Sequence, residues 1–177
     1  MVTTSGISAD RVVEAFRQSG VTHIVWLPDS ETGFLYEALV REKSLTLVPV
    51  AREGESMAVA AGLWMGGKVP LVLIQSTGFF ESGDSIRGLV LDLDLPLVMC
   101  IGYRGYERTT PRTQRPDSAA VYLEPVLQAW GIPYYLVESD EDVGRIVQAF
   151  REAEQRQGPV AVLMCTEYTA ARRRGNA

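Results

Sequence analysis

The stretch that decides the fold is LTLVPVAREGESMAVAAG, residues 45–62. Its first six residues are apolar or β-branched, which predicts a buried strand over 45–50. Glu53 follows almost directly, and the run of small side chains after it predicts a helix from about Gly54 to Met65. A strand that runs into a helix is one unit of an α/β protein. The carboxylate between the two elements needs an explanation of its own.

The same alternation of strand and helix continues along the chain. Apolar runs predict further strands at 23–28, 71–75, 96–102, 133–137 and 159–165, and amphipathic segments predict helices near 9–19, 32–42, 84–92, 119–131 and 140–158. Apolar strands without a polar alternation indicate burial on both faces, as in parallel sheets covered by helices. The sequence therefore predicts one doubly wound α/β domain with a six-stranded, mostly parallel sheet and helices on both faces.

Composition limits the class of protein. The 177-residue chain has a formal net charge of −5 and no basic face, which argues against nucleic-acid binding. No apolar run approaches the ~18 residues of a membrane span. Cys100 and Cys165 lack metal-binding spacing, which indicates a reducing compartment and no zinc site. We expect a cytoplasmic protein with one domain over residues 1–168 and a basic, flexible tail over 169–177.

Ligands of open α/β sheets bind beyond the carboxyl ends of the strands. The residues predicted there are Pro28-Asp29-Ser30, Glu53, Gln75-Ser76-Thr77-Gly78 and the segment that contains Arg104. The common nucleotide-binding and hydrolase motifs GxGxxG, GxxxxGK[ST] and GxSxG are absent. The single histidine, His23, begins a strand, so a Ser-His-Asp triad is not expected.

Two roles remain open for Glu53 from the residues alone. A carboxylate near a helix N-terminus gains ~0.3–1 kcal/mol from the helix dipole, so Glu53 could simply cap its helix. Alternatively it is a functional acid, held in place by a helix that approaches the sheet closely through the small residues Ala58, Ala61 and Gly62.

The spacing from Glu53 to Gly62 within EGESMAVAAG resembles the pyrimidine-binding domain of thiamine-diphosphate-dependent enzymes. The resemblance covers about residues 8–165. It is closest to the sulfopyruvate and phosphonopyruvate decarboxylases, in which PDS follows the first strand and Gln-x-x-Gly ends the third. Here these motifs are Pro28-Asp29-Ser30 and Gln75-Ser76-Thr77-Gly78, and YRG at 103–105 follows the fourth strand.

The resemblance implies a role for each of these residues. Glu53 would hydrogen-bond the aminopyrimidine of thiamine diphosphate and activate the cofactor. The other expected cofactor-binding residues are Pro28, Ser76, Thr77 and Gly78; the expected catalytic residues besides Glu53 are Ser30 and Gln75; the expected substrate-binding residues are Asp29, Ser30, Gln75, Phe79 and Arg104. For Ser30 and Gln75 a plain turn residue is an equal alternative.

The magnesium-binding half of such an enzyme is missing from this sequence. The family's diphosphate domain carries a Gly-Asp-Gly start and a later Asn, which together hold Mg²⁺. The only asparagine here is Asn176, far from the Gly83-Asp84 pair, and no metal ligands are expected in this chain. We therefore expect a separate β chain that carries the Mg²⁺ site, a hetero-oligomer, and a small 2-oxo acid as substrate.

The sequence thus predicts the α subunit of a split 2-oxo acid decarboxylase. Two alternatives stay open: a carboligase subunit with an acetolactate-like product, and a non-catalytic binding or regulatory domain. Two segments leave the substrate undecided. FFES (79–82) intervenes before Gly83-Asp84-Ser85, and its two aromatics are expected to be exposed to substrate or partner, or to staple the next helix. The arginine-rich loop 103–118 is expected to be exposed, and to bind an anion, to contact an acidic partner, or to be solvated.

Overall fold

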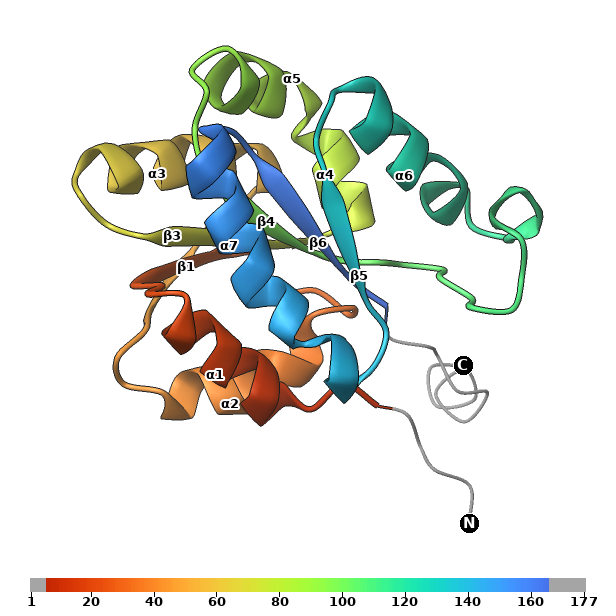
Figure 1. The fold of residues 1–177 in the computed structure, drawn as a ribbon, viewed down its shortest axis with the longest axis horizontal. Coiled ribbons are helices and arrows are strands. Elements are labelled where there is room, and N and C mark those ends of the chain that lie inside the picture. Colours follow the sequence, from red (N-terminus) through yellow and green to blue (C-terminus); the bar gives the residue numbers. More distant parts are fainter. Residues whose placement is uncertain (1–5, 166–177) are drawn as a thin grey trace.

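The structure is a computed structural model that describes residues 6–165. The predicted tail at 169–177 lies outside the described residues. The strands are β1 (His23–Trp26), β2 (Thr46–Pro49), β3 (Pro70–Gln75), β4 (Val98–Gly102), β5 (Tyr134–Val137) and β6 (Val160–Met164). They form one sheet in the order β2-β1-β3-β4-β6-β5, with every neighbouring pair parallel (Figure 1).

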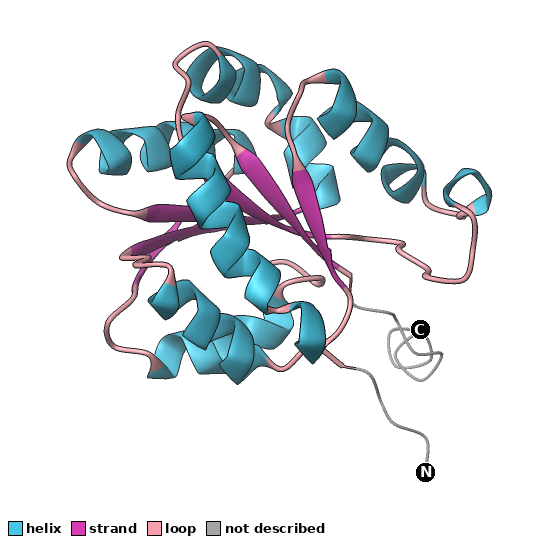
Figure 2. Cartoon of the chain, in the orientation of Figure 1, coloured by secondary structure: helices cyan, strands magenta, loops and turns pink. Residues whose placement is uncertain are grey.

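Helices cover both faces of this sheet (Figure 2). They are α1 (Ala9–Gln18), α2 (Tyr36–Arg41), α3 (Glu53–Met65), α4 (Ser76–Glu81), α5 (Gly83–Ser85), α6 (Ser118–Ala129) and α7 (Gly144–Arg156). The helices α1, α2 and α7 lie on one face, and α3 to α6 lie on the other (Figure 1). The predicted α/β class is confirmed, and the described sheet is wholly parallel.

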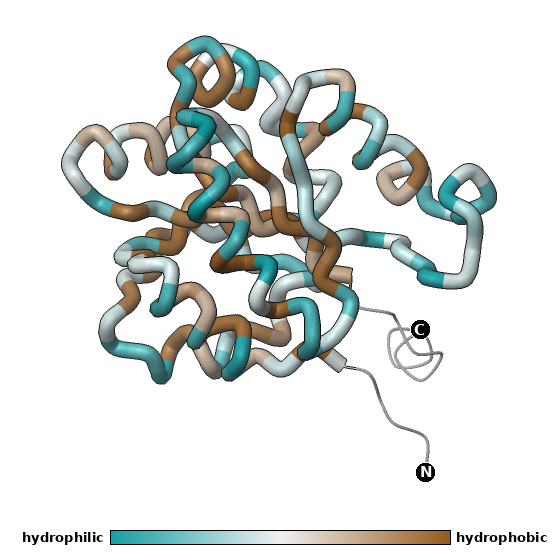
Figure 3. The backbone as a smooth tube through the Cα atoms, viewed as in Figure 1, coloured by the Kyte–Doolittle hydropathy of each residue, from teal (hydrophilic) through white to brown (hydrophobic). Residues whose placement is uncertain are grey.

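Alternate side chains of each central strand enter different cores. In β3, Leu71 and Leu73 belong to the core that also contains residues of α1 and α7, whereas Val72 and Ile74 belong to the core that contains residues of α3 and α6. Both sets are buried, which is why the strand has a continuous apolar sequence. Figure 3 shows hydrophobic segments along the central strands and hydrophilic segments on the outer helices and loops. Within residues 6–165, no helix combines the length and apolar character needed to cross a membrane.

The connections around β1 create a switch point in the sheet. From β1 the chain passes through α2 to the edge strand β2, and it then returns through α3 on the opposite face to β3. The chain therefore departs from the two neighbours β1 and β3 in opposite directions. A crevice at the carboxyl ends of such strands is the usual ligand site of open α/β sheets.

Two helix boundaries differ from the sequence-based expectation. The predicted helix at 84–92 is the short α5 followed by a π-helical segment, η2 (Ile86–Leu91). The predicted helix at 140–158 begins only at Gly144, after a 3-10 turn at Asp140–Asp142. The N-cap position of this helix is Val143, and Ser139 lies before the 3-10 turn, where its hydroxyl donates to Asp142 Oδ2 at 3.3 Å. Neither irregular turn has a strong sequence signature.

The small residues of α3 point in two directions. Met57, Ala60 and Ala61 are buried against the sheet, as expected for positions i, i+3 and i+4 of one helix face. Ala58 and Gly62 lie on the exposed face. The prediction that Ala58 and Gly62 let the helix approach the sheet is therefore wrong, whereas Ala61 does face it.

Candidate active site

Glu53 is the first residue of α3 and its side chain lies against the start of α4. A Cβ atom added at Gly78 would stand 2.5 Å from Glu53 Cγ and 2.8 Å from Oε1, closer than non-bonded atoms approach. Only glycine fits at position 78 while Glu53 keeps this conformation. Glu53 is half-buried, and no donor among the described residues hydrogen-bonds its carboxylate.

The capping of α3 is carried out by two other acids. The N-cap residue Arg52 gives no side-chain cap. Glu81 Oε2 accepts a hydrogen bond from the Gly54 amide at 2.6 Å, while Glu81 Oε1 pairs with the Arg52 guanidinium. Glu55 Oε2 accepts from the Ala51 amide at 3.2 Å. The Gly54 amide of the first turn and the Ala51 amide just before the helix therefore have their acceptors without Glu53.

The pKa of Glu81 reflects this arrangement. The hydrogen bond from Arg52 lowers the Glu81 pKa, and the Gly54 amide lowers it further against the opposing effect of desolvation. Glu81 is therefore a stable carboxylate in its cap position.

Unpartnered polar atoms gather where β3 ends. The Oε1 atom of Gln75 and the Oγ atom of Ser76 are buried, and no hydrogen-bond partner meets them among the described residues. Thr77 is exposed beside them. Buried polar atoms are nearly always hydrogen-bonded, so two neighbouring exceptions at a sheet edge indicate a place for a polar ligand.

The segment after β1 is shaped by Asp29. Its Oδ1 accepts hydrogen bonds from the amides of Glu31 and Thr32, at 2.7 and 2.8 Å, and its Oδ2 accepts from the Thr32 hydroxyl at 2.8 Å. Burial raises the Asp29 pKa, although these hydrogen bonds oppose the rise. Both oxygens serve the turn, and a carboxylate would repel an anionic substrate. Pro28 and Ser30 remain exposed on this turn.

One acid at this edge was missed by sequence reasoning. Glu31 is only 3% exposed, and its Cβ would lie 2.4 Å from a Cβ added at Gly102, the last residue of β4. Gly102 in turn pairs with Gln75 across the β3–β4 ladder. An acid after a Pro-Asp-Ser turn looks like an exposed loop residue, so the single sequence carries no signal of its burial.

Residues 79–81 of the FFES segment belong to α4, and the prediction that Phe79 is exposed to substrate is wrong. Phe79 is fully buried, with its ring centroid 5.6 Å from that of Trp130, so it is a core residue with no surface for a substrate. Phe80 is 37% exposed. The reason for the error is the unforeseen helix, whose first turn directs Phe79 inward.

The loop after β4 also differs from expectation, because its four arginines all contact partners. Arg104 pairs with Asp117 at 2.9 Å, Arg108 with Glu138 at 2.8 Å, Arg115 with Glu124 at 3.6 Å, and Arg112 donates to the Val121 carbonyl. The Arg104 side chain, predicted to bind substrate, is half exposed in its ion pair.

Arg115 is the centre of this loop. Its side chain is 7% exposed, and its guanidinium lies 4.5 Å from the ring centroid of Tyr106 and 5.5 Å from that of Tyr103. It also donates to Tyr103 Oη at 3.1 Å. The prediction of an exposed loop is therefore wrong for Arg115, which is held by cation–π contacts.

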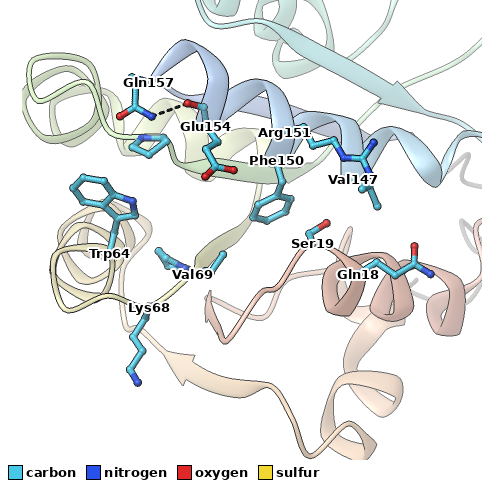
Figure 4. A pocket seen from close by; sticks show the side chains of 12 residues that line it. Gln18, Ser19, Trp64, Lys68, Val69, Val147, Phe150, Arg151, Glu154 and Gln157 are labelled. Atoms are coloured by element: carbon cyan, nitrogen blue, oxygen red, sulfur yellow. Dashed lines mark hydrogen bonds between the residues drawn. The ribbon is translucent and has the colours of Figure 1, made fainter.

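A hollow of about 370 Å³ lies at the opposite edge of the sheet, beside the start of β3. Figure 4 shows Trp64 of α3, Phe150 of α7 and Val69, just before β3, around this hollow, with the amine of Lys68 pointing away. Because ligands of open α/β sheets bind at the carboxyl ends of the strands, this hollow is not the candidate active site. Residues 6–165 contain no group of three or more His, Cys, Asp or Glu side chains that could hold a metal ion.

The predicted residues thus fall into two sets. Glu53 and Gly78 are in contact, and Gln75 and Ser76 adjoin them at the carboxyl end of β3, next to β1. Together with Pro28, Ser30 and Thr77 they form the edge that we call the β1–β3 edge. Phe79 lies in the core, and Arg104 lies beyond β4, in the loop packed against α6 and the end of β5.

Known structures share this fold. Benzoylformate decarboxylase from Polynucleobacter necessarius superposes with a TM-score of 0.72 at 20% identity, over 92% of this chain and 31% of that one. A protein from Mycobacterium smegmatis described as a thiamin diphosphate-dependent enzyme gives a TM-score of 0.64 at 21% identity, over 89% of this chain and 30% of its own. The fold is therefore that of one domain of such enzymes, and the chain spans about a third of their length.

Sequence relatives narrow the class. Sulfopyruvate decarboxylase subunit alpha of Methanococcus maripaludis is 25% identical over 162 residues, covering 91% of this chain and 96% of that subunit. Phosphonopyruvate decarboxylase of Streptomyces hygroscopicus is 28% identical over 99 residues, 56% of this chain and 25% of that enzyme. No family model matches the chain. These similarities confirm the resemblance that the sequence indicated.

Proposed function

We propose that this chain is the α subunit of a split thiamine-diphosphate-dependent decarboxylase of small 2-oxo acids, with Glu53 as the acid that activates the cofactor. The observation that carries the proposal is the state of Glu53. Its carboxylate has no hydrogen-bond donor among the described residues, although Glu55 and Glu81, close by, both cap the helix start.

The residues of the β1–β3 edge fit the pyrimidine end of the cofactor. Glu53 offers a carboxyl oxygen for a ring nitrogen, and Gly78 leaves the space that Glu53 needs. The unpartnered oxygens of Gln75 and Ser76 can accept a hydrogen bond from an amino group of the ligand. When bound, thiamine diphosphate supplies a thiazolium carbon that becomes nucleophilic once its proton is lost.

Glu53 acts on this chemistry through a proton at one of its carboxyl oxygens. A carboxyl oxygen of Glu53 would hold this proton in a hydrogen bond to the pyrimidine ring nitrogen, and Glu53 would in this way make the bound cofactor a better base. The half-buried position of Glu53 strengthens such a hydrogen bond, because water competes for it less. Ser30 and Gln75 would orient the carboxylate of the 2-oxo acid from the same edge.

The second half of the active site belongs to a partner in this proposal. The relatives called subunit alpha match this chain almost end to end, whereas the phosphonopyruvate enzyme is about four times longer than the matched region. Residues 6–165 contain no cluster of metal-ligating side chains. In the proposal a separate β chain binds the diphosphate and Mg²⁺, an ion that prefers hard oxygen ligands.

The test is the decarboxylase activity of this chain purified with its diphosphate-binding partner. CO₂ release from sulfopyruvate and phosphonopyruvate is measured for wild type, Glu53→Gln and the matched control Glu55→Gln. We expect Glu53→Gln to lower the rate of CO₂ release by ~10²–10⁴-fold, the usual contribution of an acid–base group. Glu55→Gln should stay close to wild type, because it only weakens a cap.

Wild-type activity in Glu53→Gln would contradict the mechanism. Absence of CO₂ with every 2-oxo acid, in a complex that binds the cofactor, would favour the non-catalytic alternative. Product analysis with an added acceptor aldehyde separates decarboxylation from carboligation, since only the second joins the acyl group to the acceptor.

A further inference from the structure

The first turn of α3 and the short helix α4 hold each other through two contacts, one from each helix. Glu53 of α3 lies on Gly78 of α4, and Glu81 at the end of α4 reaches back to the Gly54 amide of α3 at 2.6 Å. A Cβ added at Gly54 would lie 3.2 Å from Glu81 Oε2, so the carboxylate sits close against the backbone there. The two contacts involve neighbouring residues, Glu53 and Gly54.

We propose that Glu81 is a positioning residue for Glu53: its carboxylate fixes the first turn of α3 and thereby holds the Glu53 side chain against α4. This inference rests on the proposed function of Glu53. It assigns a role to the FFES segment, which the sequence left without one.

The contacts of Glu81 suit a positioning role better than a general structural one. The body of α3 is held by its buried face, through Met57, Ala60 and Ala61. The first turn has Ser56 buried at its end and Glu55 bonded to the Ala51 amide, but the acceptor for the Gly54 amide is Glu81 of α4. Without Glu81, the loss of order would be confined to that turn, because the backbone amides without a partner inside the helix lie there.

Both oxygens of Glu81 take part. Oε2 accepts from the Gly54 amide, and Oε1 pairs with the Arg52 guanidinium, whose side chain is 70% exposed. The ion pair orients the carboxylate, while the hydrogen bond to the backbone transmits its position to Glu53. A surface ion pair contributes little by itself, so the hydrogen bond is the contact that matters.

The first experiment needs neither cofactor nor activity. Hydrogen exchange of the Gly54 amide is measured by NMR in the full chain for wild type, Glu81→Ala, Glu81→Gln and the control Glu55→Ala. We expect Glu81→Ala to speed exchange at Gly54 at least about tenfold, since it removes the acceptor. Glu81→Gln keeps an acceptor oxygen and should retain most of the protection, and Glu55→Ala should leave Gly54 unchanged.

The second experiment uses the decarboxylase complex with its cofactor. We expect Glu81→Ala to lower kcat by about 10- to 100-fold, as for a displaced catalytic group, with a smaller change in KM. Glu81→Gln should recover most of this loss. In a Glu53→Gln background, Glu81→Ala should cause no further fall in kcat, because residues that act through one another are not additive.

Each result of these two experiments either supports or overturns the positioning role of Glu81. Unchanged exchange at Gly54, wild-type kcat in Glu81→Ala, or an equal kcat loss in the Glu53→Gln background overturns the positioning role and leaves the proposed function intact. Wild-type activity in Glu53→Gln overturns the proposed function, and the positioning role with it. A melting temperature measured for every variant separates these effects from unfolding.

Discussion

Two regions at the carboxyl edge of one sheet differ in how far their charged and polar groups are paired with one another. Beyond β4, each of the four arginines in the loop 103–117 has a polar partner, and for three of them the partner is the carboxylate of Asp117, Glu124 or Glu138. The one buried polar atom of these arginines without a hydrogen-bond partner among the described residues is Arg115 Nε. At the β1–β3 edge, the carboxylate of Glu53 and the side-chain oxygens of Gln75 and Ser76 have no hydrogen-bond partner among the described residues.

This difference distinguishes charged groups that stabilise the fold from polar groups that are available to a ligand. Charges that satisfy one another stabilise a segment and leave little for a ligand. Polar groups held in place without a partner cost stability, and such groups are found where a ligand supplies the missing contact. The sequence indicated the arginine-rich loop as a possible anion site. The β1–β3 edge, with its unpartnered polar groups, is the better candidate for a ligand site.

Among substitutions that leave Glu53 itself in place, the largest effect in this comparison is expected from closing the space that Glu53 occupies. Gly78→Ala would place a methyl group 2.5 Å from Glu53 Cγ, which forces the side chain away from α4. We expect decarboxylation by the complex to fall by about 10²-fold, the scale of a displacement of roughly 1 Å in a catalytic group.

The matched control is Gly83→Ala in α5. Its added Cβ would make an ordinary contact with Trp130 Cη2 at 3.6 Å, so activity should stay near wild type. Equal activity in Gly78→Ala and wild type would show that the position of Glu53 does not matter.

A smaller effect, on stability alone, is expected in the loop. Arg115→Met removes the guanidinium that lies over Tyr106 and Tyr103 and pairs with Glu124. We expect the free energy of unfolding to fall by roughly 1–3 kcal/mol, the range for a buried cation–π contact with hydrogen bonds. Chemical denaturation measures this loss, and kcat of the complex should change less than threefold. A kcat loss as large as that of Gly78→Ala would place the loop in the active site.

Much of the fold could be predicted from the sequence. The elements that were predicted and those that were not differ for physical reasons. Continuous apolar strands such as LVLIQ at 71–75 predicted the buried parallel sheet, because burial on both faces leaves no polar alternation. The short α4 was not predicted, since STGFFE has no helical periodicity and its helix is held by tertiary contacts.

The site was predicted only in part. The position of Glu53 at a strand end could be read from the sequence, but its freedom from capping depends on Glu81, 28 residues later. The burial of Glu31 and the inward turn of Phe79 arise from packing between distant elements, which a single sequence does not encode locally. The cytoplasmic location and the individual roles of Pro28, Ser30 and Thr77 stay predictions.

The smallest expected effect is a pH dependence of stability in the loop. The hydrogen bond from Arg108 lowers the Glu138 pKa below its ordinary value of 4.5. A carboxyl group whose pKa is lowered by folding stabilises the fold at pH values above its ordinary pKa. This contribution is lost as the pH falls through the pKa of the folded state. The stability advantage of wild type over Arg108→Gln should therefore be present at neutral pH and shrink below about pH 4.5. An advantage that does not change with pH would mean that the Arg108–Glu138 pair is not the cause.

The central claim is that Glu53 activates the cofactor. The most direct measurement is the rate at which the thiazolium C2 proton of thiamine diphosphate exchanges with deuterium, followed by quenched-flow NMR in the substrate-free complex. Wild type and Glu55→Gln should exchange fast, and Glu53→Gln should be slower by ~10²–10⁴-fold. Exchange in Glu53→Gln as fast as in wild type would contradict the account.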